Sequence, residues 1–112
     1  MGSLHGRENE YLARCVQWAW HDDATIDLLD PAGQAATRLS EWQTMVFHSA
    51  DGSTSTAGMI AFLRERYGDR VPPGFEQDVF NAAQELIFDL KAVELRQHKA
   101  SLPEAFDLPQ KS

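Results

Sequence analysis

The strongest pattern in the chain is a regular spacing of apolar residues across positions 75–90. These residues recur at intervals of three and four, which places their side chains on one side of an α-helix. They are Phe75, Val79, Ala82, Ala83, Leu86, Ile87 and Leu90. A helix with one apolar side needs other elements to cover it, so the pattern predicts a packed globular domain built in layers.

A shorter helix is expected to begin at Ser40. Ser40 and Gln43 match a capping box, in which the hydroxyl and the Gln side chain satisfy backbone N–H groups at a helix start. Trp42, Met45 and Val46 then give this helix a short apolar side.

A further helix is expected between these two. Either Ser53 or Thr54 can cap its first turn, and Gly68 is placed to end it. Its apolar residues are Ile60, Leu63 and Tyr67.

A β-hairpin is expected ahead of the helices. Residues 24–29 and 34–39 suit strands, and the Asp-Pro-Ala-Gly sequence at 30–33 suits the turn between them. A continuous helix across residues 34–47 is the competing interpretation. At the other end, Val-Glu-Leu at residues 93–95 alternates as a short closing strand does.

The segment at residues 10–20 fits two patterns. Helical spacing connects Leu12, Cys15, Val16 and Ala19. The spacing of one strand face connects Leu12, Val16, Trp18 and Trp20. We favour the helix and keep the strand as the alternative.

These elements predict an α+β domain of the winged-helix type, with a β-hairpin, three helices and a short closing strand. We place this domain at residues 24–96, after an N-terminal segment (1–23) and before a polar C-terminal tail (97–112). A chain of 112 residues of which 43% are hydrophobic can bury one core without disulfides or metal.

The expected location is the cytoplasm. The chain has one cysteine, Cys15, so it can form no internal disulfide, which suits a reducing compartment. No apolar run reaches the roughly 18 to 20 residues that a membrane helix needs. The first residues also lack the basic and apolar parts of a secretory signal.

The charge of the chain argues against nucleic acid and anionic membranes as partners. Asp and Glu outnumber Lys and Arg by 17 to 10, giving a net charge of −7, whereas nucleic-acid binding needs a basic face. A winged-helix DNA-binding regulator remains the alternative function. Its recognition helix would be residues 75–90, where four carboxylates and no Lys or Arg would face the phosphates.

No catalytic, cofactor or metal site is expected. His21, Asp22 and Asp23 are adjacent, but no second group of ligands returns at a spacing that zinc or calcium requires. Cys15 has no neighbouring base to activate its thiol. The Ser-Thr-Ser-Thr sequence at residues 53–56 lacks a glycine-rich phosphate loop. The chain is therefore interpreted as non-enzymatic.

Residues 25–93 resemble the PqqD-like family of small winged-helix domains. The resemblance rests on Ile-Asp-Leu-Leu-Asp-Pro-Ala-Gly-Gln at 26–34, Arg-Leu-Ser at 38–40, Trp42, and Ala-Asp-Gly-Ser-Thr at 50–54. The apolar positions of the later helices and of the final strand follow in order. Trp42 lacks the preceding glycine of the family, and residues 1–20 and the tail have no counterpart in it.

The resemblance implies that the domain binds a precursor peptide along a sheet edge and presents it to a modifying enzyme, often a radical SAM protein. Such pairing gains affinity from backbone hydrogen bonds. The expected partner-binding residues are Ile26 and Leu28, on a hairpin edge with few protecting charges, and Trp18 and Trp20 as interface anchors. The remaining alternative is a dimeric scaffold or regulatory subunit, in which the same edge pairs with a second copy.

Overall fold

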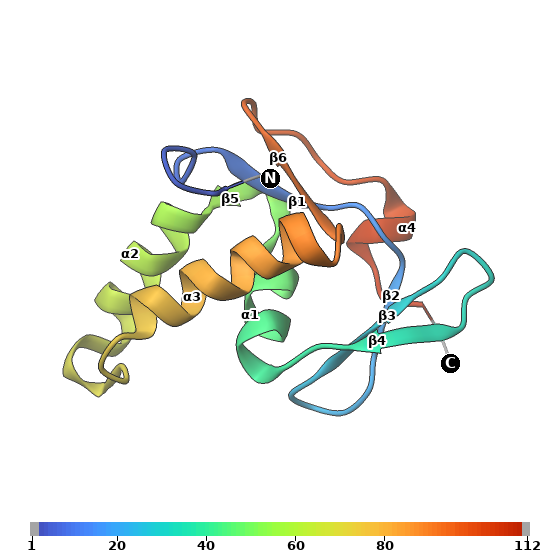
Figure 1. Ribbon diagram of the computed structural model, residues 1–112, viewed down its shortest axis with the longest axis horizontal. Coiled ribbons are helices and arrows are strands. Elements are labelled where there is room, and N and C mark those ends of the chain that lie inside the picture. The colour runs from blue at the N-terminus through green and yellow to red at the C-terminus, as the bar shows by residue number, and fades with distance from the viewer. Residues whose placement is uncertain (1–2, 111–112) are drawn as a thin grey trace.

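The computed structural model describes residues 3–110 as two three-stranded antiparallel sheets with helices packed beside them (Figure 1). The strands are β1 (Tyr11–Arg14), β2 (Trp18–Trp20), β3 (Ile26–Leu29), β4 (Ala35–Arg38), β5 (Asp51–Ser55) and β6 (Val93–Arg96). The helices are α1 (Glu41–Ser49), α2 (Thr56–Tyr67), α3 (Phe75–Gln84) and α4 (Glu104–Asp107). A 3₁₀ turn, η1 (Gly68–Arg70), follows α2, and a π-helical turn, η2 (Glu85–Asp89), follows α3. The predicted α+β class is confirmed.

The N-terminal segment forms strands, so the helix favoured for residues 10–20 was wrong. β1 is the central strand of the sheet β5-β1-β6, with Leu12 opposite Thr54 on one side and Leu95 on the other. Leu12 and Ala13 point to opposite faces of the sheet and both are fully buried, so this strand is covered on both faces. A short strand that is buried on both faces has apolar residues at consecutive positions, and these also fit the spacing of a helix.

The second sheet has the order β2-β3-β4 and contains the predicted hairpin. β3 and β4 pair antiparallel across the turn, where the Asp30 carboxylate accepts hydrogen bonds from the N–H groups of Ala32 and Gln34, both at 2.9 Å. The register shifts by one residue within the pair, which leaves Ala36 as a bulge. Residues 35–38 form a strand, so the continuous helix considered for residues 34–47 does not form.

The helices follow the predicted signals with two local differences. Ser40 and Gln43 form the capping box of α1 as expected. The cap of α2 is Ser55, the last residue of β5, which accepts from the Gly58 N–H. The predicted caps Ser53 and Thr54 lie earlier in the same strand. The long apolar helix begins at Phe75 and widens into η2 after Gln84. No helix within residues 3–110 is long and apolar enough to cross a membrane.

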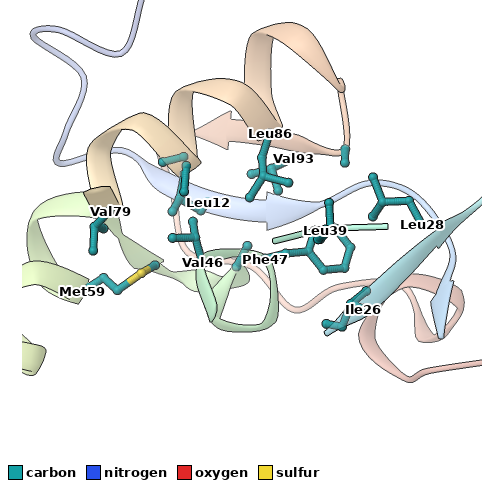
Figure 2. Packing of buried hydrophobic residues seen from close by; sticks show 14 of the residues in the cluster. Leu12, Ile26, Leu28, Leu39, Val46, Phe47, Met59, Val79, Leu86 and Val93 are labelled. Atoms are coloured by element: carbon teal, nitrogen blue, oxygen red, sulfur yellow. The ribbon is translucent and has the colours of Figure 1, made fainter. Parts of the chain in front are cut away.

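The core lies where α1, α3 and the sheet β5-β1-β6 meet, and it continues beneath the hairpin sheet (Figure 2). Val79 of α3 and Leu86 of η2 are fully buried there beside Val46 and Phe47 of α1. The predicted apolar sides of the helices also include Leu90, Ile60, Leu63 and Trp42. All four pack against the core but remain partly buried.

The C-terminal residues bridge the two sheets. The Ala100 N–H donates to the Gly52 carbonyl in β5 at 3.2 Å, and the Gln110 N–H donates to the Trp18 carbonyl in β2 at 2.7 Å. Between these points α4 lies alongside both sheets (Figure 1). We call residues 97–110 the C-terminal strap.

Gly52 allows the strap to pass close to β5, which gives a test of that contact. Its φ is +86°, and a Cβ added there would lie 2.0 Å from the Ala100 carbonyl oxygen. Gly33 has nearly the same φ, +85°, with open space around it. We expect Gly33→Ala to lower the free energy of unfolding by about 1–2 kcal/mol, the cost of left-handed backbone alone. Gly52→Ala should cost at least about 1 kcal/mol more because the strap must also move.

Urea unfolding of the two variants and the unchanged protein measures this difference. Equal losses for Gly52→Ala and Gly33→Ala would mean that the strap does not depend on its contact with β5.

Candidate protein-interaction site

The four residues expected to contact a partner lie on one face of the sheet β2-β3-β4. Trp18 is opposite Leu28 and Trp20 is opposite Ile26, so the alternation of side chains places all four together. This face packs toward α1: Ile26 is 0%, Trp18 1% and Leu28 6% exposed, whereas Trp20 is 42% exposed. Of the four side chains, only that of Trp20 is open to a partner in this structure.

The open edge of the hairpin is also not where it was expected. β3, which carries Ile26 and Leu28, has β2 on one side and β4 on the other. The sequence reasoning considered the hairpin alone and did not foresee that β2 would pair with β3. Of the two hairpin strands, only β4 has an edge without a neighbouring strand in residues 3–110.

The outer edges of the sheets differ in how they are covered. The strap covers part of β5 through Ala100 and part of β2 through Gln110. Within residues 3–110, no segment hydrogen-bonds to the outer edge of β4 or of β6. β6 is the more sheltered of the two, because Val93 is buried and Leu95 and Arg96 are partly buried. β4 is thus the most accessible edge.

The side chains of β4 leave its backbone within reach. Ala35 and Ala36 are small and exposed, and Thr37 is partly exposed. Arg38 is the one charged residue of the strand, and its Nε lies 3.1 Å from Asp27 Oδ1 on β3. Soluble proteins usually protect such edges with lysines, prolines or inward charges. β4 has only the Arg38 charge and the bulge at Ala36.

Arg14 is a buried charged residue that was not expected from the sequence. Its side chain is almost fully buried, yet it donates to the carbonyls of Phe47, His48, Phe106 and Asp107. The shortest of these bonds are Nη1 to the His48 oxygen at 2.6 Å and Nε to the Phe106 oxygen at 2.8 Å. These carbonyls end α1 and α4, where helix carbonyls lack internal partners and the helix dipole favours a cation.

The groups around Arg14 offset the energetic cost of burying its charge. The Asp107 carboxylate is 3.3 Å from Nη2, and the guanidinium lies over the rings of Trp18 and Phe47, at 5.4 and 5.8 Å from their centroids. Burial lowers the pKa of Arg14, and the charge of Asp107 opposes that shift. The signal in the sequence was a single charge within the otherwise uncharged stretch from Tyr11 to Trp20.

Aromatic rings extend from Arg14 to the surface. Trp18 Nε1 donates to the Phe106 carbonyl at 2.8 Å, so Trp18 and Arg14 hold the same strap oxygen. Trp18 packs edge-on against Trp20 at 5.6 Å, and Trp20 lies 5.3 Å from the ring of His48. The cluster thus leads from a buried cation to the exposed face of Trp20.

The structure also describes the surroundings of the other groups that the sequence analysis considered for chemistry. The thiol of Cys15 has a pKa raised by burial and by Glu94, so it stays protonated. Within residues 3–110 no three His, Cys, Asp or Glu side chains are placed to hold a metal ion. From Phe75 to Asp89, α3 and η2 carry Glu76, Asp78, Glu85 and Asp89 without any Lys or Arg.

The comparisons with known proteins add no relative. A scan against protein-family models finds no match to the chain, and searches of curated proteins and of solved structures find no similar protein. The resemblance to the PqqD-like family stays a prediction.

His48 makes the stability of this cluster depend on pH. Burial lowers its pKa, and the charge of Arg14 lowers it further. The unfolded chain therefore takes up a proton near the ordinary pKa of about 6.5, while the folded protein still resists it. Stability should be fully present above that value and decline as the pH falls below it.

We expect the melting temperature to fall more between pH 8 and pH 5 in the unchanged protein than in His48→Gln, measured by circular dichroism. His98→Gln, at an exposed position outside this cluster, is the matched control. Identical pH curves for His48→Gln and the unchanged protein would mean that His48 does not cause the pH dependence of stability.

Proposed function

We propose that the protein is a non-enzymatic module that binds a peptide or protein by adding a partner strand to the outer edge of β4. The observation that carries this proposal is the accessibility of β4, a strand with a neighbour on one side and exposed small residues. Strand addition gains affinity from backbone hydrogen bonds and needs no catalytic or metal group.

The backbone of β4 has defined groups to offer. Leu39 N–H donates to the Ile26 carbonyl, so Leu39 faces β3. Because residues of an antiparallel pair alternate in direction, the N–H and carbonyl of Arg38 face outward. A partner strand would bond to the backbone of Arg38.

The resemblance to the PqqD-like family suggests which partners to seek. They are a precursor peptide and a modifying enzyme of the radical SAM type, which would supply its own cofactor. A cytoplasmic location agrees with such partners. Pairing of β4 with β4 of a second copy, giving a homodimer, is the alternative use of the same edge.

The direct test compares Arg38→Pro with Arg38→Ala. Proline removes the outward N–H without breaking the ladder to β3, while alanine removes only the side chain. Peptides would first be selected from a display library of short random sequences against the unchanged protein. We expect Arg38→Pro to weaken their binding by about tenfold or more, as the loss of a backbone hydrogen bond and the steric clash of the ring imply. Arg38→Ala should retain most of the affinity.

Two further measurements complete the test. Both variants should melt cooperatively, which shows that each one is folded. Sedimentation of the unchanged protein separates a homodimer from a monomer with a free edge. Undiminished peptide binding together with an unchanged mass in folded Arg38→Pro would reject β4 as the interaction surface.

A further inference from the structure

The C-terminal strap is held on the protein mainly through its backbone. Carbonyls of Phe106 and Asp107 accept from Arg14 and Trp18, and the Gln110 N–H donates to the Trp18 carbonyl. The side chains contribute little, because α4 has no buried residue and Leu108 is 52% exposed. A segment held in this way can be replaced by another segment with the same backbone groups.

The residues beneath the strap determine what kind of segment could take its place. Arg14 is a buried cation whose donors need oxygen acceptors, since an unpaired buried charge is strongly unfavourable. The strap supplies two carbonyls and the carboxylate of Asp107. A neutral apolar segment offers no such carboxylate, so the surface favours an acidic one.

The edge of β2 continues this surface. His21 N–H donates to the Thr25 carbonyl and Leu29 N–H to the Gln17 carbonyl, so alternate residues of β2 face β3. Trp18 and Trp20 therefore direct their backbone groups outward, to the side where Gln110 bonds to Trp18. The exposed ring of Trp20 lies on the same strand.

We propose that Arg14, Trp18, Trp20 and the outer edge of β2 form a second peptide-binding surface, which the strap occupies within the same chain. Its occupant from another protein is an acidic peptide segment that places a carboxylate on Arg14 and adds an extended stretch to β2. The strap then acts as an internal competitor that sets the affinity for that segment. β2 and β4 are opposite edges of their sheet, so this surface is separate from the one at β4.

The probe is a fluorescein-labelled peptide with the sequence of residues 101–110, added to the full-length protein. In the unchanged protein the strap competes at the high effective concentration of a tethered segment. The double variant Asp107→Asn, Gln110→Pro removes the carboxylate that pairs with Arg14 and the N–H that bonds to the Trp18 carbonyl. We expect fluorescence anisotropy to show about tenfold or more tighter binding of the probe to this double variant.

Matched controls separate the proposal from general loosening of the protein. Glu104→Gln removes an equal charge from α4, and we expect it to bind the probe as weakly as the unchanged protein. A probe carrying Asn in place of its Asp should bind the double variant more weakly than the original probe. Arg38→Pro, added to the double variant, should leave probe binding unchanged, so failure here is distinct from failure at β4.

The proposal is overturned if the double variant binds the probe no better than the unchanged protein, or if a scrambled probe binds it equally well. If the double variant does not melt cooperatively, the single variant Gln110→Pro gives the same comparison, because it changes only the last bond of the strap.

Discussion

The guanidinium of Arg14 is the interaction on which the arrangement of this molecule depends. It joins β1 to the last turn of α1 and to the strap through backbone carbonyls of Phe47, His48, Phe106 and Asp107. A buried charge is tolerated only when its donors are satisfied, so each of these segments is needed unless another acceptor takes its place. Trp18 links the same strap oxygen to the hairpin sheet. The two sheets are thus held together around one cation.

The position of Arg14 explains why some sheet edges are covered by the strap and others are not. The strap can reach β5 at Gly52 and β2 at Trp18 because Arg14 anchors it between them. β4 lies on the far side of its sheet from β2, and no segment among residues 3–110 hydrogen-bonds to its outer edge. An accessible edge is a liability in a soluble protein unless it is protected or used. We infer that β4 is used, and that the covered edge of β2 is used only when the strap is displaced.

The parts of the fold that the sequence predicted are those determined by local interactions. The capping box at Ser40 and Gln43, the hairpin turn at Asp30 and the apolar side of α3 each depend on residues a few positions apart. The central position of β1 could not be predicted in that way, since its neighbours β5 and β6 lie far along the chain. Without that pairing, Leu12 and Val16 fit a helix as well as a strand.

The same limit applied to the candidate site. Ile26 and Leu28 were correctly placed in a strand, but the pairing of β2 with β3 turned that strand into an interior one. Trp18 and Trp20 look equivalent in sequence, yet the first is buried against Phe47 and the second lies at the surface. Arg14 meets the strap across more than ninety positions of sequence. No local pattern predicts that contact.

Hydrogen exchange in Arg14→Lys tests the central role of Arg14 most directly. Lysine keeps the charge but lacks the planar fork that reaches α1 and the strap together. The account predicts that the Trp18 indole N–H and the Gln110 amide exchange at least about tenfold faster, which corresponds to about 1.4 kcal/mol of local opening. The Leu39 amide, bonded to Ile26 within the hairpin, should stay protected. Unchanged protection at both Trp18 and Gln110 would contradict the account.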